Sequence, residues 1–286
     1  MSIWFSPAVL GLTVCCGLAV AIAGIVLGRR HEGLGRMSVR LLLSAGVFVV
    51  VLVVGLALTT GAPRLLGLPL VLAPGAGVAA ALLLFGAVPW RTVDRPVTRT
   101  AALVRRPAWS AATARAYGRP ITVGCALIAV LMVTGLTGSP DDAGRSRAFT
   151  VAARGSTNSA SPYPGWFYAA PLLATTVVIV VAAAIAIRRT ALLPARSLDP
   201  AVDARWRQGI ASVLSRIAAA GLLLYLAVTL FMVGDALRTT SLNVPGGWGV
   251  GAAAASLGGL LAALAALLSL VSAVRRAISP SSKVAV

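Results

Sequence analysis

A chain of 286 residues with 58% hydrophobic and 11% charged residues is more apolar than a soluble domain, in which about 45–50% of residues are apolar and about 25% are charged. A mean hydropathy of +0.92 agrees with an integral membrane protein. The net charge of +18 does not indicate nucleic-acid binding, because the arginines lie in short segments between apolar runs and not on one soluble surface.

A membrane-spanning helix needs about 20 predominantly apolar residues. We expect spans at residues 7–28, 41–60, 65–88, 120–136, 167–187, 210–233 and 248–274. The arginines of the first segment follow its apolar run, so we interpret it as a mature span and not as a signal peptide. The sequence therefore predicts an all-α, polytopic membrane bundle of seven helices that forms a single domain over residues 1–286.

The third predicted span contains Pro69 and Pro74, and Pro74 is followed by Gly75. Proline removes a backbone hydrogen bond, which in lipid must be replaced by neighbouring helices or water. We therefore expect a kink or a short re-entrant break near residues 73–77. Residues 75–80 fit the pattern GxGxxA, but they do not lie between a strand and a helix, as phosphate binding by that pattern requires.

The segment 90–119 is predicted to be a basic cytoplasmic loop. Its only acid is Asp94, and its arginines are Arg91, Arg95, Arg99, Arg105, Arg106, Arg115 and Arg119. Such a loop fixes membrane orientation. It can also contact anionic lipid headgroups, which attract juxtamembrane arginines, or a separate cytoplasmic subunit.

The segment 139–165 is predicted to be extracytoplasmic. Ser139 to Asp142 resembles a helix start, so we expect a short helix that ends at Gly155, with the two aspartates as caps and not as a cation site. The aromatic residues from Trp166 onward suit the headgroup region at the start of the next span.

Asp199 and Pro200 predict the start of a helix that continues into the sixth span. Arg216 and Asp235 are the candidates for a polar site inside the membrane, although Arg216 is close enough to the interface for its side chain to reach water. Small residues recur every fourth position in the seventh span. They are Gly247, Gly251, Ala255, Gly259 and Ala263. This stripe permits close helix contact, so we expect spans six and seven to form a tight hairpin.

Basic residues alternate between the two sides of the predicted bundle. The segments after spans one, three, five and seven carry 19 of the 25, those after spans two, four and six carry five, and Arg216 is the remaining one. The bias predicts an outer N-terminus and a cytoplasmic tail at residues 275–286. Arginine dominates, Lys283 being the only lysine, which is typical of a GC-rich bacterial genome. We expect a multi-pass protein of the bacterial cytoplasmic membrane.

Residues for catalysis or metal binding are sparse. His31 is the only histidine, and Cys15, Cys16 and Cys125 lie in apolar runs without CxxC spacing. We therefore expect no enzyme, no catalytic or metal site and no cofactor. No carboxylate lies in the middle of a predicted span, which argues against a proton- or sodium-coupled carrier.

The predicted topology resembles that of three groups of seven-helix proteins. Light-driven retinal proteins are excluded, because the seventh span has no lysine, and heptahelical receptors share the topology alone. Residues 21–30 and 181–189 would occupy equivalent places in the repeats of a SWEET-type sugar carrier, but the only glutamine, Gln208, leaves no Pro-Gln motif.

These observations favour a transport-related, permease-like membrane subunit that works with a separate cytoplasmic ATPase or regulator, because no segment between spans is long enough to fold as its own domain. The alternative is a non-transporting sensor or assembly protein that uses the segment 139–165. Enzymatic activity ranks third, because acid/base pairs and activated nucleophiles are missing.

Overall fold

The computed structural model describes residues 35–61, 66–87, 111–153, 156–192, 200–244 and 246–278. Within these ranges the chain forms six long helices and a three-stranded antiparallel sheet. The elements are α2 (Gly35–Gly61), α3 (Leu68–Ala87), α4 (Ala111–Thr137), β1 (Ser139–Pro140), β2 (Ser146–Ala153), β3 (Ser156–Ala160), α5 (Trp166–Ala191), α6 (Pro200–Asn243) and α7 (Trp248–Ile278).

All six helices are long and apolar enough to cross a membrane. Large apolar side chains also cover their outer faces: Val53 on α2, Val133 on α4 and Leu268 on α7 are 60%, 61% and 68% exposed. Contiguous apolar surface of this extent is rare on soluble monomers and is expected where helices meet lipid. The prediction of a helical membrane bundle is confirmed. The span predicted at 7–28 lies outside the described residues, so the seventh helix stays a prediction.

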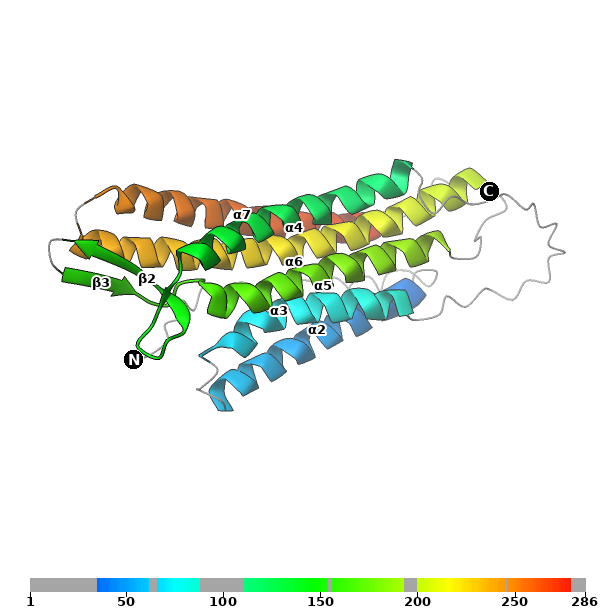
Figure 1. Ribbon diagram of the computed structural model, residues 1–286. Helices are drawn as coiled ribbons and strands as arrows, with labels where there is room; N and C mark the ends of the chain where they lie inside the picture. Colours follow the sequence, from blue (N-terminus) through cyan, green and yellow to red (C-terminus); the bar gives the residue numbers. More distant parts are fainter. Residues whose placement is uncertain are drawn as a thin grey trace.

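The helices lie side by side along one long bundle, and the small sheet covers one of its ends (Figure 1). We call this the hairpin end, formed by residues 138–165. The opposite end holds the first turns of α4 and α6 and the last turns of α5 and α7. We call it the arginine end, because it carries Arg115, Arg119, Arg188, Arg189, Arg275 and Arg276. The described helix ends predicted to share one side of the membrane thus share one end of the bundle.

Helix α6 is the centre of the packing. It contributes to the main hydrophobic core together with α3, α4 and α5, and it makes its most extensive contact with α7. A side chain at Gly259 would meet the Ala227 carbonyl oxygen and the Phe231 ring at 3.2 Å, and one at Gly251 would meet Leu237 at 3.3 Å. The predicted tight hairpin of the last two spans is confirmed, and part of its small-residue stripe serves contact within the chain.

Helix α6 is continuous from Pro200 through the apolar run of the predicted sixth span, as its predicted start requires. Near this start the Arg207 guanidinium donates to the carbonyls of Ala191 at 2.6 Å and Thr190 at 3.4 Å. A cation at the last carbonyls of α5 is favoured by the helix dipole. Arg207 therefore ties the start of α6 to the end of α5.

Helix α4 begins at Ala111, nine residues before the predicted fourth span, so residues 111–119 are not part of a loop. Apolar runs mark only the part of a helix that lies in lipid, whereas the alanine-rich first turns of α4 are favoured by helix propensity. Arg115 and Arg119 consequently project from a helix.

The helix predicted between Ser139 and Gly155 is wrong, because Ser139–Pro140 and Ser146–Ala153 are the strands β1 and β2 of a sheet with the order β1-β2-β3. The Asp141 carboxylate accepts hydrogen bonds from the N–H groups of Ala143 and Arg145 at 3.0 and 2.8 Å, and Gly144 has a φ of +75°. Aspartate followed by a glycine with left-handed φ closes a turn, a pattern that overlaps with a helix cap in sequence.

Tertiary contacts reinforce the strand conformation of β2. The Phe149 ring centroid lies 5.2 Å from that of Tyr163 and 5.4 Å from that of Trp248. Aromatic and β-branched residues such as Phe149, Thr150 and Val151 also favour strands. The sheet is thus held on the ends of the helices by aromatic packing.

The ion pairs of the Asp141 carboxylate stabilise the hairpin end in a way that can be tested. Its ion pairs are with Arg147 and, at 3.3 Å, with Arg145. The side-chain hydrogen bond from Arg147, followed by the backbone N–H of Arg145, holds the pKa of this carboxyl well below its usual range. Because the pKa is depressed, the stabilisation is complete above the ordinary value of about 3.9 and is lost only as the pH falls through the lower folded-state pKa.

We therefore expect the amides of β2 to be equally protected from hydrogen exchange at about pH 7 and about pH 5, once intrinsic exchange rates are corrected for. Asp141→Asn removes the charge at every pH and should lower the protection of β2. Asp142→Asn, the same change at the exposed neighbouring residue, should leave it unchanged. Equal protection in both variants would contradict the role given to Asp141.

Candidate functional site

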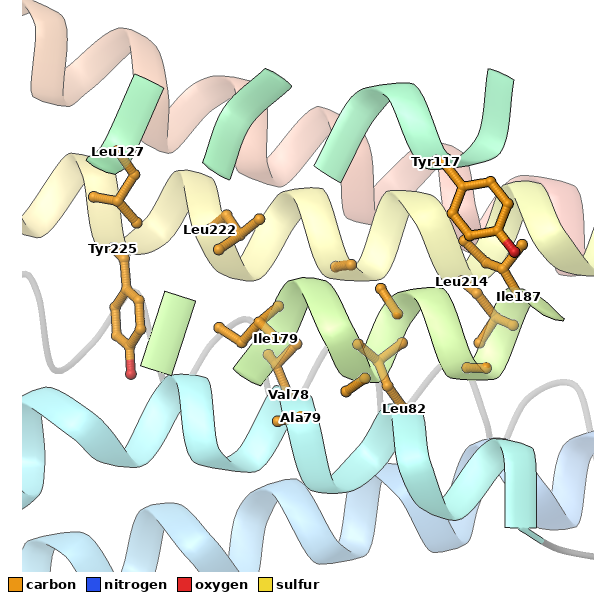
Figure 2. Packing of buried hydrophobic residues seen from close by; sticks show 14 of the residues in the cluster. Val78, Ala79, Leu82, Tyr117, Leu127, Ile179, Ile187, Leu214, Leu222 and Tyr225 are labelled. Atoms are coloured by element: carbon orange, nitrogen blue, oxygen red, sulfur yellow. The ribbon is translucent and has the colours of Figure 1, made fainter. Parts of the chain in front are cut away.

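The most distinctive polar contact in the bundle joins α6 to the backbone of α3. The Tyr225 hydroxyl accepts a hydrogen bond from the Gly75 N–H at 2.8 Å and donates one to the Leu72 carbonyl at 2.7 Å. The Tyr225 ring leaves α6 and points towards α3 (Figure 2). We call these three residues the tyrosine clasp.

Pro74 and Gly75 allow the Tyr225 hydroxyl to reach the backbone of α3. Pro74 has no N–H to give to the helix, so the backbone ladder is interrupted one residue before Gly75. A Cβ at Gly75 would lie 2.2 Å from the Tyr225 hydroxyl oxygen, so only glycine leaves room for the phenol. Of the two forms predicted near residues 73–77, the re-entrant break is wrong, because α3 continues through Pro74 and Tyr225 meets the backbone groups there. The kink stays a prediction.

An apolar hollow opens between the pair α2–α3 and the pair α6–α7. Its cavity volume is about 60 Å³, and part of it is open to the outside of the bundle. Its lining comes from all four helices and is Ser44, Ala45, Phe48, Val78, Ala81, Leu82, Phe85, Leu214, Ile217, Ala220, Gly221, Leu224 and Leu270. Ser44 is the only residue of this lining that has a hydroxyl, and it donates to the Ala81 carbonyl at 3.1 Å.

The hollow belongs to one half of the bundle. Its lining residues on α3 run from Val78 towards the arginine end, and those on α6 run from Leu224 in the same direction. Tyr225 lies next to this lining on the hairpin side, and Figure 2 shows it beyond Val78 and Leu82. The clasp therefore bounds a hollow that lies towards the arginine end.

The buried core has no Asp, Glu, His, Lys or Arg among the described side chains. Its polar members other than tyrosine are Ser44, Thr134, Thr176, Thr190, Ser215, Thr229 and Thr240. Most of these hydroxyls donate to a carbonyl of their own helix, as Thr176 does to Leu172 at 2.7 Å. Such a core suits an apolar or amphiphilic molecule better than a bare ion.

A second polar cluster lies at the arginine end, where α4, α6 and α7 meet. The Arg216 guanidinium donates to the hydroxyls of Ser272 and, at 3.4 Å, of Ser212. Arg276 donates to the same Ser212 hydroxyl at 3.1 Å, and Arg119 is close enough to interact electrostatically with Arg216. We call these five residues the arginine cluster.

The predicted site residues do not come together in one site. Arg216 is partly buried in the arginine cluster, and Arg115 and Arg119 are exposed on α4. Asp235 is exposed on α6 near the hairpin end, and no described residue forms a salt bridge with it. Five further candidates lie outside the described residues, namely Arg91, Arg95, Arg99, Arg105 and Arg106.

Sequence reasoning missed the clasp and the two serines of the arginine cluster. The pair Pro74-Gly75 inside a span signalled that some group must meet the α3 backbone, but nothing in the sequence singled out Tyr225. Ser212 and Ser272 are ordinary helix residues until α6 and α7 are packed together.

Comparison with family models, with curated proteins and with solved structures finds no match for this chain.

Proposed function

We propose that this chain is the membrane subunit of a transport system, permease-like in action, in the cytoplasmic membrane of a bacterium. The observation that carries the proposal is the apolar hollow, which lies on one side of the tyrosine clasp and opens between two helix pairs. A binding space between two helix pairs that is bounded towards one end fits a transporter in which these pairs move against each other. The apolar lining suits an amphiphilic or apolar substrate.

A separate polypeptide is proposed to supply the energy. The described core has no buried carboxylate for proton or sodium coupling, and the segments between spans are too short to fold as an ATPase domain. The arginine end, with the basic segment 90–119, is the surface proposed to receive that partner on the cytoplasmic side.

The hollow can be tested by filling it. Ala81→Trp places a large ring in the hollow, whereas Leu83→Trp places the same ring at a position on α3 that is 42% exposed on the outside of the bundle. With the phenotype of a deletion strain as the readout, we expect Leu83→Trp to complement and Ala81→Trp, at equal abundance in the membrane, to fail. Full complementation by Ala81→Trp would contradict the use of the hollow.

The partner can be tested by purification and reconstitution. Extracted in mild detergent, the chain should retain a stoichiometric ATPase, and alone in liposomes it should not accumulate any solute against a gradient. Uphill transport by the isolated chain would overturn this part of the proposal.

The alternative, a sensor or assembly protein, is favoured by the firm attachment of the hairpin end. The Tyr163 hydroxyl lies 2.6 Å from that of Thr137, and Phe149 packs on Tyr163, so the sheet is fixed to α4 and to the helix ends. A sheet held in this way can present its polar edge to an outer ligand. Loss of the phenotype on removal of β2 and β3, with the Ala81→Trp variant fully active, would select this function.

A further inference from the structure

The arginine cluster concentrates positive charge without a matching negative charge. Arg276 and Arg216 donate to one shared hydroxyl, that of Ser212, and Arg119 adds a third guanidinium nearby. In the described part of the chain no carboxylate pairs with any of the three, since the described salt bridges all belong to Asp141. Like charges held together repel one another, so a bound anion would stabilise this arrangement.

The serines hold the guanidiniums in place. Ser212 accepts hydrogen bonds from both arginines, and the Ser272 hydroxyl, which itself donates to the Ser269 carbonyl at 2.9 Å, accepts from Arg216. A guanidinium is a planar fork of donors that matches phosphate oxygens, and an oriented fork loses less conformational entropy on binding. The cluster is therefore built for a phosphate group.

The spacing of the arginines along α6 would place the cluster at the level of lipid headgroups. On α6, Arg216 and Arg238 flank the 21 residues from Ile217 to Leu237, which at 1.5 Å per residue span about 30 Å, the thickness of the hydrocarbon core. On α4, Arg119 likewise precedes a largely apolar helix that ends at Thr137. In a bilayer of this thickness, the cluster would lie level with the phosphates of one leaflet.

From this geometry we propose that the arginine cluster binds the headgroup phosphate of an acidic phospholipid from the leaflet at the arginine end. The lipid bridges α4, α6 and α7 across their ends. The inference does not depend on the proposed transport function, because it requires only that the bundle spans a bilayer.

The test measures retention of phosphatidylglycerol by the full-length chain in phosphatidylcholine nanodiscs. The variant Arg216→Gln/Arg276→Gln is compared with Arg115→Gln/Arg188→Gln, which removes the same charge from exposed arginines at the same end of the bundle. General attraction to anionic lipid falls in both. We expect the first variant to bind phosphatidylglycerol about tenfold more weakly than the second, as loss of charge-assisted hydrogen bonds requires.

Equal retention by the two variants would overturn the proposal. If free inorganic phosphate displaced phosphatidylglycerol and, without added lipid, raised the melting temperature of the chain, the cluster would be a site for a soluble anion. This result would refute the lipid assignment. If Arg216→Gln/Arg276→Gln does not fold, Ser212→Ala/Ser272→Ala keeps every charge and removes the acceptors that orient the arginines. That variant should still weaken retention severalfold, and unchanged retention would equally overturn the proposal.

Discussion

Gly75→Ala should be the most destabilising single-methyl substitution on α3. The new Cβ would lie 2.2 Å from the Tyr225 hydroxyl oxygen and 2.5 Å from two ring carbons, so α3 and α6 must separate or the ring must leave the clasp. Overpacking of this kind costs about 1–3 kcal/mol, and the lost hydrogen bonds add to it, so we expect the free energy of unfolding to fall by about 3 kcal/mol or more. Reversible unfolding in mixed micelles measures this change.

Two further variants separate the cost of the steric clash from the cost of the lost hydrogen bonds. Tyr225→Phe keeps the ring but leaves the Gly75 N–H and the Leu72 carbonyl without their partner, which should cost about 1–2 kcal/mol by the range known for membrane interiors. Thr176→Val also removes one buried hydroxyl, but that hydroxyl bonds only within its own helix, so the cost should be smaller.

Gly118→Ala is the matched control for the collision. This residue also lies in a helix, and nothing is within 4 Å of its added Cβ, so the change should be neutral or stabilising by up to about 1 kcal/mol. If Gly75→Ala behaved like Gly118→Ala, the clasp would not exist as described.

Gly165→Ala should detach the sheet from the helix ends. Gly165 has an ordinary φ of −66°, so glycine is needed there for space and not for conformation. A Cβ would lie 2.5 Å from the Ser146 carbonyl oxygen, which belongs to the backbone of β2 and cannot rotate away. We expect a cost of about 1–3 kcal/mol, expressed as faster hydrogen exchange and proteolysis of β2.

The control for this prediction is Gly247→Ala, also at the hairpin end, where the added Cβ meets nothing within 4 Å. It should leave the exchange of β2 as in the wild-type protein. Unchanged protection of β2 in Gly165→Ala as well would contradict the close approach of Gly165 and Ser146.

The membrane bundle could be predicted because lipid imposes a strong local rule. Each span must satisfy its backbone within one apolar helix, so runs such as residues 41–60 and 167–187 identify their helices without tertiary information. The α6–α7 hairpin could also be predicted, because the short connection before Trp248 and the small-residue stripe involve helices that are neighbours in the sequence.

The sheet and the clasp could not be predicted, because both depend on partners far away in the chain. Asp141 suits a turn as well as a helix start, and the choice depends on Phe149 meeting Tyr163 and Trp248. Tyr225 is 150 residues from Gly75, so its role follows only from the packing of α6 against α3. The hollow, likewise, is a property of four helices together.

The proposed docking of a cytoplasmic partner rests on the claim that the arginine end faces the cytoplasm, and labelling of single cysteines tests it directly. Cys15, Cys16 and Cys125 are first replaced by alanine, and a cysteine is introduced at Ser159 in β3 or at Ala114 near the start of α4, both exposed. A membrane-impermeant maleimide should label the Ser159 position in intact cells and the Ala114 position only after the membrane is opened. Labelling of Ala114 and not of Ser159 in intact cells would contradict the orientation and, with it, the proposed partner surface.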